Sequence, residues 1–434
     1  MGVGVRLSPN NMLIKAPCNP FEVSMVASIA DPESLGKGSG ILPRGMRENV
    51  PGRKEKGSKK KNMKCLLFVV LVAVCLLFQT GCSGGSSPSA AESTAGSTTT
   101  VSTTVSTTVP PTLWQRTPGS SGMIASLAID PANTQTVYAG SASRYTPGGI
   151  IKTTNGAASW TEIANGITCK GVNALAIDPH NSQTLYAGGS TVSTPPRGDV
   201  IFKTINGGAS WTAISTDLPY GIIGSLAVDP ANSQVVYAGI TTAAGCGGGP
   251  CPGDIGSLFK SINGGASWAT VKIGSAVTSF AIDPRMSEIA YAGTDAGGVF
   301  KTTDGGVSWT AINDGLTTGS RVTSLAIDLS NSQVIYAASY VGVFKTLDGG
   351  TSWTAIPDFP TGKSVNYITI DPSSTQIVYA GTNDGVFKTL DGGLSWTAIS
   401  AGLTNHYVHS LAIDPLNTKV VYAGTNDGVF KLLE

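Results

Sequence analysis

Short runs of alternating apolar and polar residues fill the chain from residue 113 to its end, and one arrangement of them repeats. It is clearest in residues 322–356, where the runs VTSLAI, QVIYAA, GVFKT and SWTAI are separated by segments rich in Asp, Asn, Ser and Gly. Runs of four to six residues with many β-branched and aromatic side chains predict strands, and the segments between them predict hairpin turns. We therefore expect antiparallel sheets of four strands, named A to D in chain order.

Two intervals inside this unit never change. Asp precedes Tyr by eight residues seven times, and Lys precedes Trp by eight residues six times. The Asp–Tyr pairs are Asp130/Tyr138, Asp178/Tyr186, Asp229/Tyr237, Asp283/Tyr291, Asp328/Tyr336, Asp371/Tyr379 and Asp414/Tyr422. A four-stranded unit that recurs every 43 to 54 residues is typical of β-propeller blades.

The number of runs predicts a closed ring. Seven units supply strands A to C, but the last stops at Glu434 before any D run, and an unmatched run at residues 113–117 precedes the first unit. We expect this N-terminal strand to complete the last blade and remove its open edge. The predicted fold is all-β: a seven-bladed β-propeller of four-stranded antiparallel blades over residues 113–434.

The first 112 residues have a different composition and predict export. Residues 1–62 show no periodic pattern, and we interpret them as a non-functional or misassigned extension. Residues 63–81 contain an apolar run of 14 residues after a basic stretch, which predicts a signal peptide. Residues 82–112 are almost wholly small and polar and predict a flexible tether.

The residues around Cys82 resemble a bacterial lipoprotein signal. That resemblance implies that Cys82 carries the lipid and that the protein is anchored to the cell envelope, facing the periplasm or the exterior. Gln79 departs from the pattern, since such signals usually carry Leu there. An ordinary secretory signal cut nearby, or an uncleaved anchor, is the alternative.

Composition narrows the possible partners. Only 13% of residues are charged and 55 are Gly, which suits strands and turns better than helices. Beyond residue 64 the chain has 16 Lys and Arg against 22 Asp and Glu. Because that balance is acidic, we expect no nucleic-acid partner.

Six C–D segments share the motif Ser/Thr-x-Asp/Asn-x-Gly-x-Ser/Thr-Trp, with Ala157 in place of Gly in the first. The motif resembles the Asp-box (BNR) repeat of sialidases, xyloglucanases, sortilin-type receptors and the photosystem II stability/assembly factor family. The resemblance covers residues 113–434 and implies a propeller fold. It says little about activity, because the fold carries many unrelated functions.

The recurring Asp of this motif has two interpretations. A calcium loop would favour carboxylates throughout, yet Asn155, Asn206 and Asn263 stand where other blades have Asp. A turn tolerates both residues, so we expect structural turns and no metal or other cofactor. By the same argument, we expect the Lys present in all seven blades to have a structural role. A single site must break the symmetry, so it must be formed by residues that differ between blades.

The symmetry breaks between strands B and C. From Tyr to Lys the separations are 14, 17, 23, 10, 9, 9 and 9 residues along the seven blades. Enlarged loops on a rigid scaffold are where binding usually occurs, so we expect a binding rim on blades one to three. Its candidate contacts are Arg144, Tyr145, Arg197, Asp199 and Asp254. Solvated loops with no ligand are the alternative.

Cysteines add one further expectation. Cys246 and Cys251 lie in the longest of these loops, and in an exported protein they most simply form a local disulfide. Cys169 also lies beyond the signal, so three pairings are possible and the sequence does not choose among them.

An enzymatic alternative depends on Asp295. The segment Tyr291 to Gly298 resembles the YAxTDxGG segment of xyloglucanases, and this resemblance implies a catalytic role for Asp295 beside a second carboxylate. Xyloglucanases pair Asp residues from two propellers, whereas this chain has repeats for one. The arginine triad of sialidases has no counterpart here. Similarity to the photosystem II stability/assembly factor family implies a scaffold instead.

We therefore expect a monomeric, envelope-anchored binding propeller without catalytic residues, which recognises a protein or polysaccharide partner through the rim of blades one to three. Glycoside hydrolysis of the xyloglucanase type is the alternative.

Overall fold

The computed structural model describes residues 6–8, 11–13, 113–142, 149–190, 200–214, 218, 221–241, 257–317, 319–360 and 362–434. The chain divides into two units, Met1–Ser102 and Thr103–Glu434. In the first unit, β1 (Arg6–Ser8) pairs antiparallel with β2 (Asn11–Leu13). This pair was not expected, because residues 1–62 show no alternation. The division of residues 1–112 into extension, signal and tether remains a prediction.

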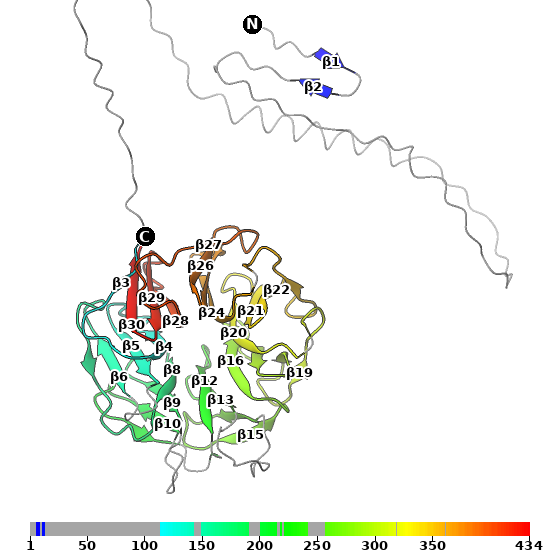
Figure 1. Ribbon diagram of the computed structural model, residues 1–434. Coiled ribbons are helices and arrows are strands. Elements are labelled where there is room, and N and C mark those ends of the chain that lie inside the picture. Colours follow the sequence, from blue (N-terminus) through cyan, green and yellow to red (C-terminus); the bar gives the residue numbers. More distant parts are fainter. Residues whose placement is uncertain are drawn as a thin grey trace, which may run out of the picture. The chain divides into compact units, whose positions relative to one another are not determined.

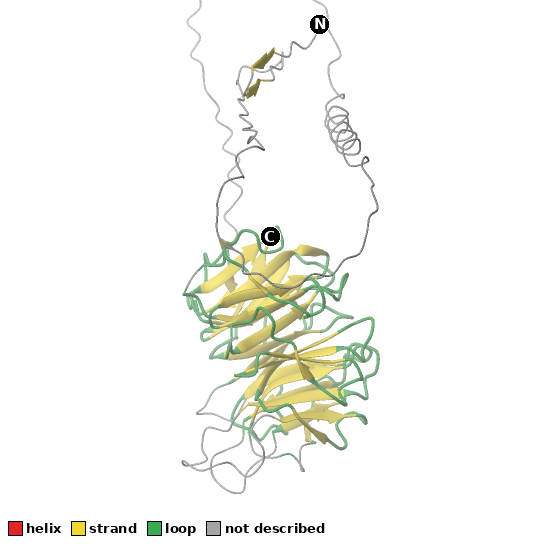
Figure 2. Ribbon diagram, turned by 90° about the vertical axis from the view of Figure 1, so that its right-hand side faces the viewer, coloured by secondary structure: helices red, strands yellow, loops and turns green. Residues whose placement is uncertain are grey.

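The second unit is a ring of seven four-stranded antiparallel sheets (Figure 1). The predicted all-β propeller is therefore confirmed. The side view colours the described residues as strands and turns, and these residues contain no helix (Figure 2).

The strands occupy the same four places in every blade. The A strands are β4 (Ile124–Ile129), β8 (Val172–Ile177), β12 (Ile222–Val228), β16 (Val277–Ile282), β20 (Val322–Ile327), β24 (Val365–Asp371) and β28 (Val408–Ile413). The B strands are β5 (Val137–Ser141), β9 (Leu185–Gly189), β13 (Val236–Thr241), β17 (Ala290–Thr294), β21 (Ile335–Ser339), β25 (Ser374–Thr382) and β29 (Val420–Thr425).

The two outer strands complete each blade. The C strands are β6 (Ile150–Thr153), β10 (Ile201–Thr204), β14 (Ser257–Ser261), β18 (Val299–Thr302), β22 (Gly342–Thr346), β26 (Gly385–Thr389) and β30 (Gly428–Leu433). The D strands are β7 (Thr161–Glu162), β11 (Thr212–Ala213), β15 (Ala269–Lys272), β19 (Thr310–Ala311), β23 (Thr354–Ala355) and β27 (Thr397–Ala398), with β3 (Gln115–Arg116) as the seventh.

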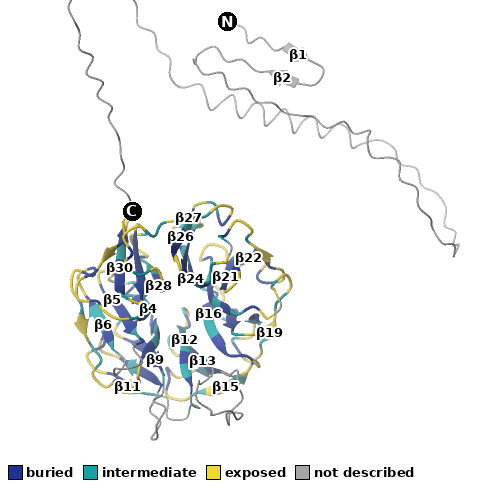
Figure 3. Cartoon of the chain, in the orientation of Figure 1, coloured by how far each residue is buried: buried dark blue, intermediate teal, exposed yellow. Residues whose placement is uncertain are grey.

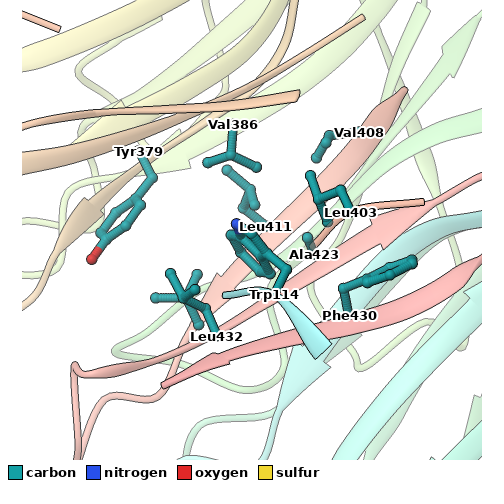
Figure 4. Packing of buried hydrophobic residues seen from close by; sticks show 10 residues of the cluster. Trp114, Tyr379, Val386, Leu403, Val408, Leu411, Ala423, Phe430 and Leu432 are labelled. Atoms are coloured by element: carbon teal, nitrogen blue, oxygen red, sulfur yellow. The ribbon is translucent and has the colours of Figure 1, made fainter. Parts of the chain in front are cut away.

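The N-terminal strand closes the ring as predicted. The last sheet has the order β28-β29-β30-β3, with Gln115 opposite Lys431 and Arg116 opposite Phe430. Trp114, 2% exposed, is buried with Phe430 and Leu432 at the junction of the last two blades (Figure 4). Its Nε1 donates a hydrogen bond to the Ile399 carbonyl at 2.6 Å.

The core lies between neighbouring blades. One buried cluster joins Tyr138 of the first blade to Val172 and Phe202 of the second, and the other clusters join later neighbours in the same way. Figure 3 shows this burial along the inner strands and exposure at the turns. The ring is therefore held by contacts between wedges, which fixes the positions of the loops at either face.

Candidate functional site

The A–B and C–D turns share one face of the ring. In six blades the first Gly of the C–D turn donates its N–H to a carbonyl of the A–B turn, as Gly349 does to Gln333 at 3.0 Å. The B–C and D–A connections therefore lie on the opposite face, which we call the variable face. The three enlarged B–C segments join strands whose described ends are on that face.

The C–D turns are held by side-chain hydrogen bonds. The Thr346 hydroxyl donates to Asp348 Oδ1 at 2.7 Å, and the Ser352 N–H donates to the same oxygen at 3.0 Å. Asn206 accepts the equivalent bonds, from the Thr204 hydroxyl at 2.8 Å and the Ser210 N–H at 3.0 Å. Since Asn and Asp serve equally, these contacts support the turn interpretation over a calcium loop.

The repeated Lys of strand C is framework. Its ammonium group donates to the carbonyl of the first Gly in the C–D turn of the next blade. The pairs are Lys152–Gly207 (2.9 Å), Lys203–Gly264 (2.8 Å), Lys260–Gly305 (2.6 Å), Lys301–Gly349 (2.9 Å), Lys345–Gly392 (2.9 Å) and Lys431–Gly156 (2.8 Å). Lys388 pairs with Glu434 instead, because the seventh blade has no C–D turn.

A β-bulge in every A strand places one residue at the centre of the ring. The pairing of strands A and B skips one residue near the start of A, as at Thr323 between Val322 and Ser324. A bulge leaves its extra residue unpaired and redirects the side chain. The bulge residues are Ala125, Asn173, Gly224, Thr278, Thr323, Asn366 and His409, and all seven line a central cavity of about 200 Å³.

This central cavity shares part of its lining with a wider pocket of about 270 Å³. Because the A strands begin on the variable face, the wider pocket is the mouth of the central channel on that face. Its lining is Ala125, Gly224, Thr241, Thr278, Arg321, Thr323, Tyr340, Asn366, Tyr407 and His409. We call this pocket the channel mouth. Thr241 is the last described residue before the longest enlarged segment.

Arg321 forms one wall of the channel mouth. Its guanidinium carbon lies 4.9 Å from the centre of the Tyr340 ring, and Nε lies 2.8 Å from Asp295 Oδ1. Arg321 Nε makes no hydrogen bond, so this contact is an ion pair. The two side chains are 41% and 42% exposed, and such pairs stabilise folding by about 0–1 kcal/mol. The pair with Asp295 therefore orients the guanidinium and contributes little to the stability of the fold.

His409 and Tyr407 form another part of the wall. Their ring centres are 4.7 Å apart, and His409 Nε2 lies 2.8 Å from Asn426 Oδ1. Burial lowers the pKa of the His409 imidazole below its usual value, and this outweighs the bond to Asn426. The imidazole is therefore mainly neutral at pH 7. Tyr407 is 41% exposed and Tyr340 is 48% exposed, so two aromatic rings face solvent around one cationic group.

In blades six and seven, the carboxylates that the structure describes on the variable face are paired with cations. Asp384 contacts Lys363 and lies 3.9 Å from His406 Nδ1, and the contact with Lys363 lowers the pKa of Asp384. Asp427 lies 3.6 Å from Arg116. Asp295 likewise pairs with a guanidinium. Each of these three carboxylates is therefore paired with a cation, whereas a glycosidase needs two neighbouring carboxyl groups.

The residues predicted for the binding rim, Arg144, Tyr145, Arg197, Asp199 and Asp254, lie outside the described residues, and so do Cys82, Cys246 and Cys251. Asp295 is the one predicted site residue that the structure describes.

Cys169 is a free, buried thiol whose Sγ lies 3.4 Å from the Gly171 carbonyl. Burial raises the pKa of this thiol to about 11. Of the pairings left open by the sequence, none that involves Cys169 is present.

Across the part of the chain with described coordinates, no three His, Cys, Asp or Glu side chains gather where they could hold a metal ion. Within the same residues, no helix has the length and apolar content to cross a membrane.

Sequence reasoning missed the channel mouth. Its signal is present in the repeat: the second position of the A strand changes from blade to blade while its neighbours remain apolar or small. The polar set at that position in blades four to seven, together with Arg321, Tyr340 and Tyr407 just beside it, departs from the repeat as clearly as the loop lengths do.

Comparison with known proteins identifies the class of fold. No family model matches the sequence. Over 183 residues the chain is 26% identical to a xyloglucanase of Hypocrea jecorina (strain QM6a), a match that covers 38% of this chain and 20% of that protein.

Solved structures give the same class. The GH74 xyloglucanase from Xanthomonas campestris superposes with a TM-score of 0.59 at 21% identity, covering 74% of this chain and 53% of that one. YCF48 bound to D1 peptide gives a TM-score of 0.54 at 12% identity, covering 74% and 96%.

These likenesses show a β-propeller fold alone. This chain spans about half the length of the xyloglucanase structure and a fifth of the curated relative, so their activities remain proposals here.

Proposed function

We propose that this protein is an exported, non-enzymatic binding propeller that recognises a protein or polysaccharide partner on its variable face. The observation that carries the proposal is the channel mouth, where Arg321, Tyr340, Tyr407 and His409 surround a pocket on the face that bears the enlarged loops. Exposed aromatic rings and Arg are the residues that dominate binding energy at interfaces.

The enlarged loops of blades one to three extend this proposed surface. Arg144, Tyr145, Arg197, Asp199 and Asp254 are its candidate contacts there, and Cys246 with Cys251 would stiffen the longest loop. The small bulge residues Ala125 and Gly224 leave the mouth open beside those blades, while the larger side chains stand across it. We propose that a ligand bridges the mouth and the loop rim.

The wider assignment rests on resemblance. The C–D turns resemble Asp-box repeats, and the single ring with a lipoprotein-like signal resembles the photosystem II stability/assembly factor family. YCF48, which superposes along nearly its whole length, is known bound to a peptide. A monomer tethered through Cys82 to a bacterial envelope, facing the periplasm or exterior, fits these features.

The test is capture of the partner from the native membrane fraction by the full-length protein. We expect Arg321→Ala to reduce recovery at least about tenfold, because a charge-assisted hydrogen bond to a ligand contributes roughly 1.5–3 kcal/mol. Arg285→Ala is the matched control, since Arg285 follows the buried Asp283 in an A–B turn on the opposite face. Charge reversal at Arg144 and Arg197 tests the loop rim, and undiminished recovery by either variant would refute the corresponding surface.

Glycoside hydrolysis is the second candidate, favoured by the position of Asp295 beside the channel mouth. Its test is hydrolysis of soluble xyloglucan by the wild type and by Asp295→Ala. Turnover by the wild type that disappears in the variant would replace the binding proposal. We expect no turnover, because Asp295 is held in an ion pair with Arg321.

A further inference from the structure

A second cavity lies away from the channel mouth, between blades five and six, beside their C–D turns. Its volume is about 430 Å³, larger than the mouth pocket. Strand β23 and the residues after it form one side, and the C–D turn of blade six forms the other. The apolar lining includes Leu347, Ile356, Pro357 and Leu394. We call this cavity the blade 5–6 groove.

The two leucines of the groove are largely exposed to solvent. Leu347 is 67% exposed and Leu394 is 75% exposed, although the sequence motif leaves both positions free to be polar. Single exposed apolar residues are ordinary on protein surfaces, but several that line one cavity indicate a contact surface.

Three carboxylates border the same groove: Asp348, Asp358 and Asp391. Hydrogen bonds from the Ser352 N–H and from the Thr346 and Ser352 hydroxyls lower the pKa of Asp348 to about 2, and equivalent bonds lower the pKa of Asp391. Both are therefore ionised at neutral pH. Lys345 is the one cation in the lining, and its ammonium group is bonded to the Gly392 carbonyl at 2.9 Å.

Comparison with the other blades shows that this combination of leucines and carboxylates is not part of the repeated scaffold. The positions of Leu347 and Leu394 are occupied by Thr154 and Ala209, Ile205 and Ala266, Ile262 and Val307, and Thr303 and Thr351 at the four earlier junctions. The Ile262–Val307 junction shares the apolar pair but has Asn263 and Ile273 where the blade 5–6 groove has Asp348 and Asp358. A large apolar pair with three carboxylates occurs at one junction alone.

We propose that the blade 5–6 groove is a docking site for a segment of a partner polypeptide in which a Leu-sized apolar side chain lies next to Lys or Arg. The apolar side chain enters between Leu347 and Leu394, and the cation meets the carboxylate border. Charge complementarity selects this occupant, because an anionic membrane or a nucleic acid would be repelled by the same carboxylates. The site is separate from the channel mouth and does not depend on the function proposed there.

The test uses a random peptide display library selected on the full-length protein. We expect enrichment of peptides in which Leu, Ile, Met or Phe neighbours Lys or Arg, and a synthetic consensus peptide with a dissociation constant of about 10 µM. Leu394→Ser and Asp358→Asn should each weaken that peptide at least about tenfold. Both side chains are exposed, so neither change disturbs the core.

Val307→Ser is the matched control, since Val307 is the equivalent of Leu394 in blade four and is 77% exposed. Full binding by Val307→Ser and by Arg321→Ala would support the groove. The proposal is overturned if no basic and apolar consensus is enriched, if Leu394→Ser binds like the wild type, or if Arg321→Ala abolishes binding. Groove-dependent binding to vesicles of anionic phospholipid would also overturn it, in favour of a membrane contact.

Discussion

At the scale of single residues, the constant Asp–Tyr and Lys–Trp intervals describe one joint between blades. Tyr336 and Lys345 both donate to the Gly392 carbonyl, at 3.0 and 2.9 Å, and the ammonium group lies 4.9 Å from the centre of the Tyr336 ring. Asp328 accepts the N–H groups that begin the A–B turn, from Ser330 at 2.7 Å and Asn331 at 3.1 Å. The intervals are fixed because one end of each, Tyr336 or Lys345, bonds to the C–D turn of the next blade, while Asp328 holds its own turn and Trp353 contacts the preceding blade.

These buried tyrosines predict cooperative alkaline unfolding. Burial, with a smaller effect of the nearby Asp, raises the pKa of Tyr138, Tyr186, Tyr291 and Tyr422 from 10.0 to about 12. Because the folded pKa exceeds the unfolded one, the stabilisation is complete below about pH 10 and is lost as pH rises toward about 12. Phenolate absorbance and circular dichroism should therefore change together. Ionisation of all seven B-strand tyrosines while the sheet signal persists would contradict this.

At the scale of elements, the alternation of the sequence predicted the inner strands well and the outer strand less well. SWTAI was expected as a strand, yet β23 contains only Thr354 and Ala355. Trp353 lies outside the ladder and contacts the preceding blade, since its backbone N–H donates to the Asp314 carbonyl and its Nε1 donates to the Ile312 carbonyl, each at 2.8 Å. Local alternation carries no information about contacts of this kind with a neighbouring blade.

Two glycines near this junction allow the cost of tight packing to be measured apart from the cost of backbone strain. Gly315 and Gly319 have φ values of +83° and +73°. A Cβ on Gly315 would lie 1.9 Å from the Trp353 carbonyl oxygen, whereas nothing lies within 4 Å of a Cβ on Gly319. We expect Gly319→Ala to lower the free energy of unfolding by roughly 1 kcal/mol and Gly315→Ala by a further 1–3 kcal/mol, about the range for overpacking. Equal losses in urea unfolding would show that the blade junction is not tightly packed.

At the scale of the whole molecule, the ring and its closure could be predicted because the strands of a repeating sequence can be counted directly. The channel mouth could not be predicted in the same way. It is assembled from bulge residues of different blades, such as Asn366 and His409, and local alternation does not indicate which residue of a strand is bulged. The loop rim was predicted from length alone, which indicates where a surface varies and not what it binds.

Removal of residues 113–117 tests the closure. The deletion removes β3, buried Trp114, and the bonds from Trp114 N–H to Ala401 and from Thr117 N–H to Val429, each 2.9 Å. Loss of a buried Trp alone costs about 3–5 kcal/mol, so we expect the melting temperature to fall by roughly 10 °C. Deletion of five residues within 83–112 is the control. A melting curve that is unchanged by the first deletion would show that the ring does not need its N-terminal strand.

The sharing of the last blade by both chain ends also sets the order of events when the protein is made. Arg116 is translated more than three hundred residues before its partner Phe430, so the first strand must wait for the final one. A prematurely terminated chain has an unpaired sheet edge where the complete ring is closed, and such edges promote aggregation. An unpaired edge on this sheet therefore distinguishes an unfinished copy from a finished one.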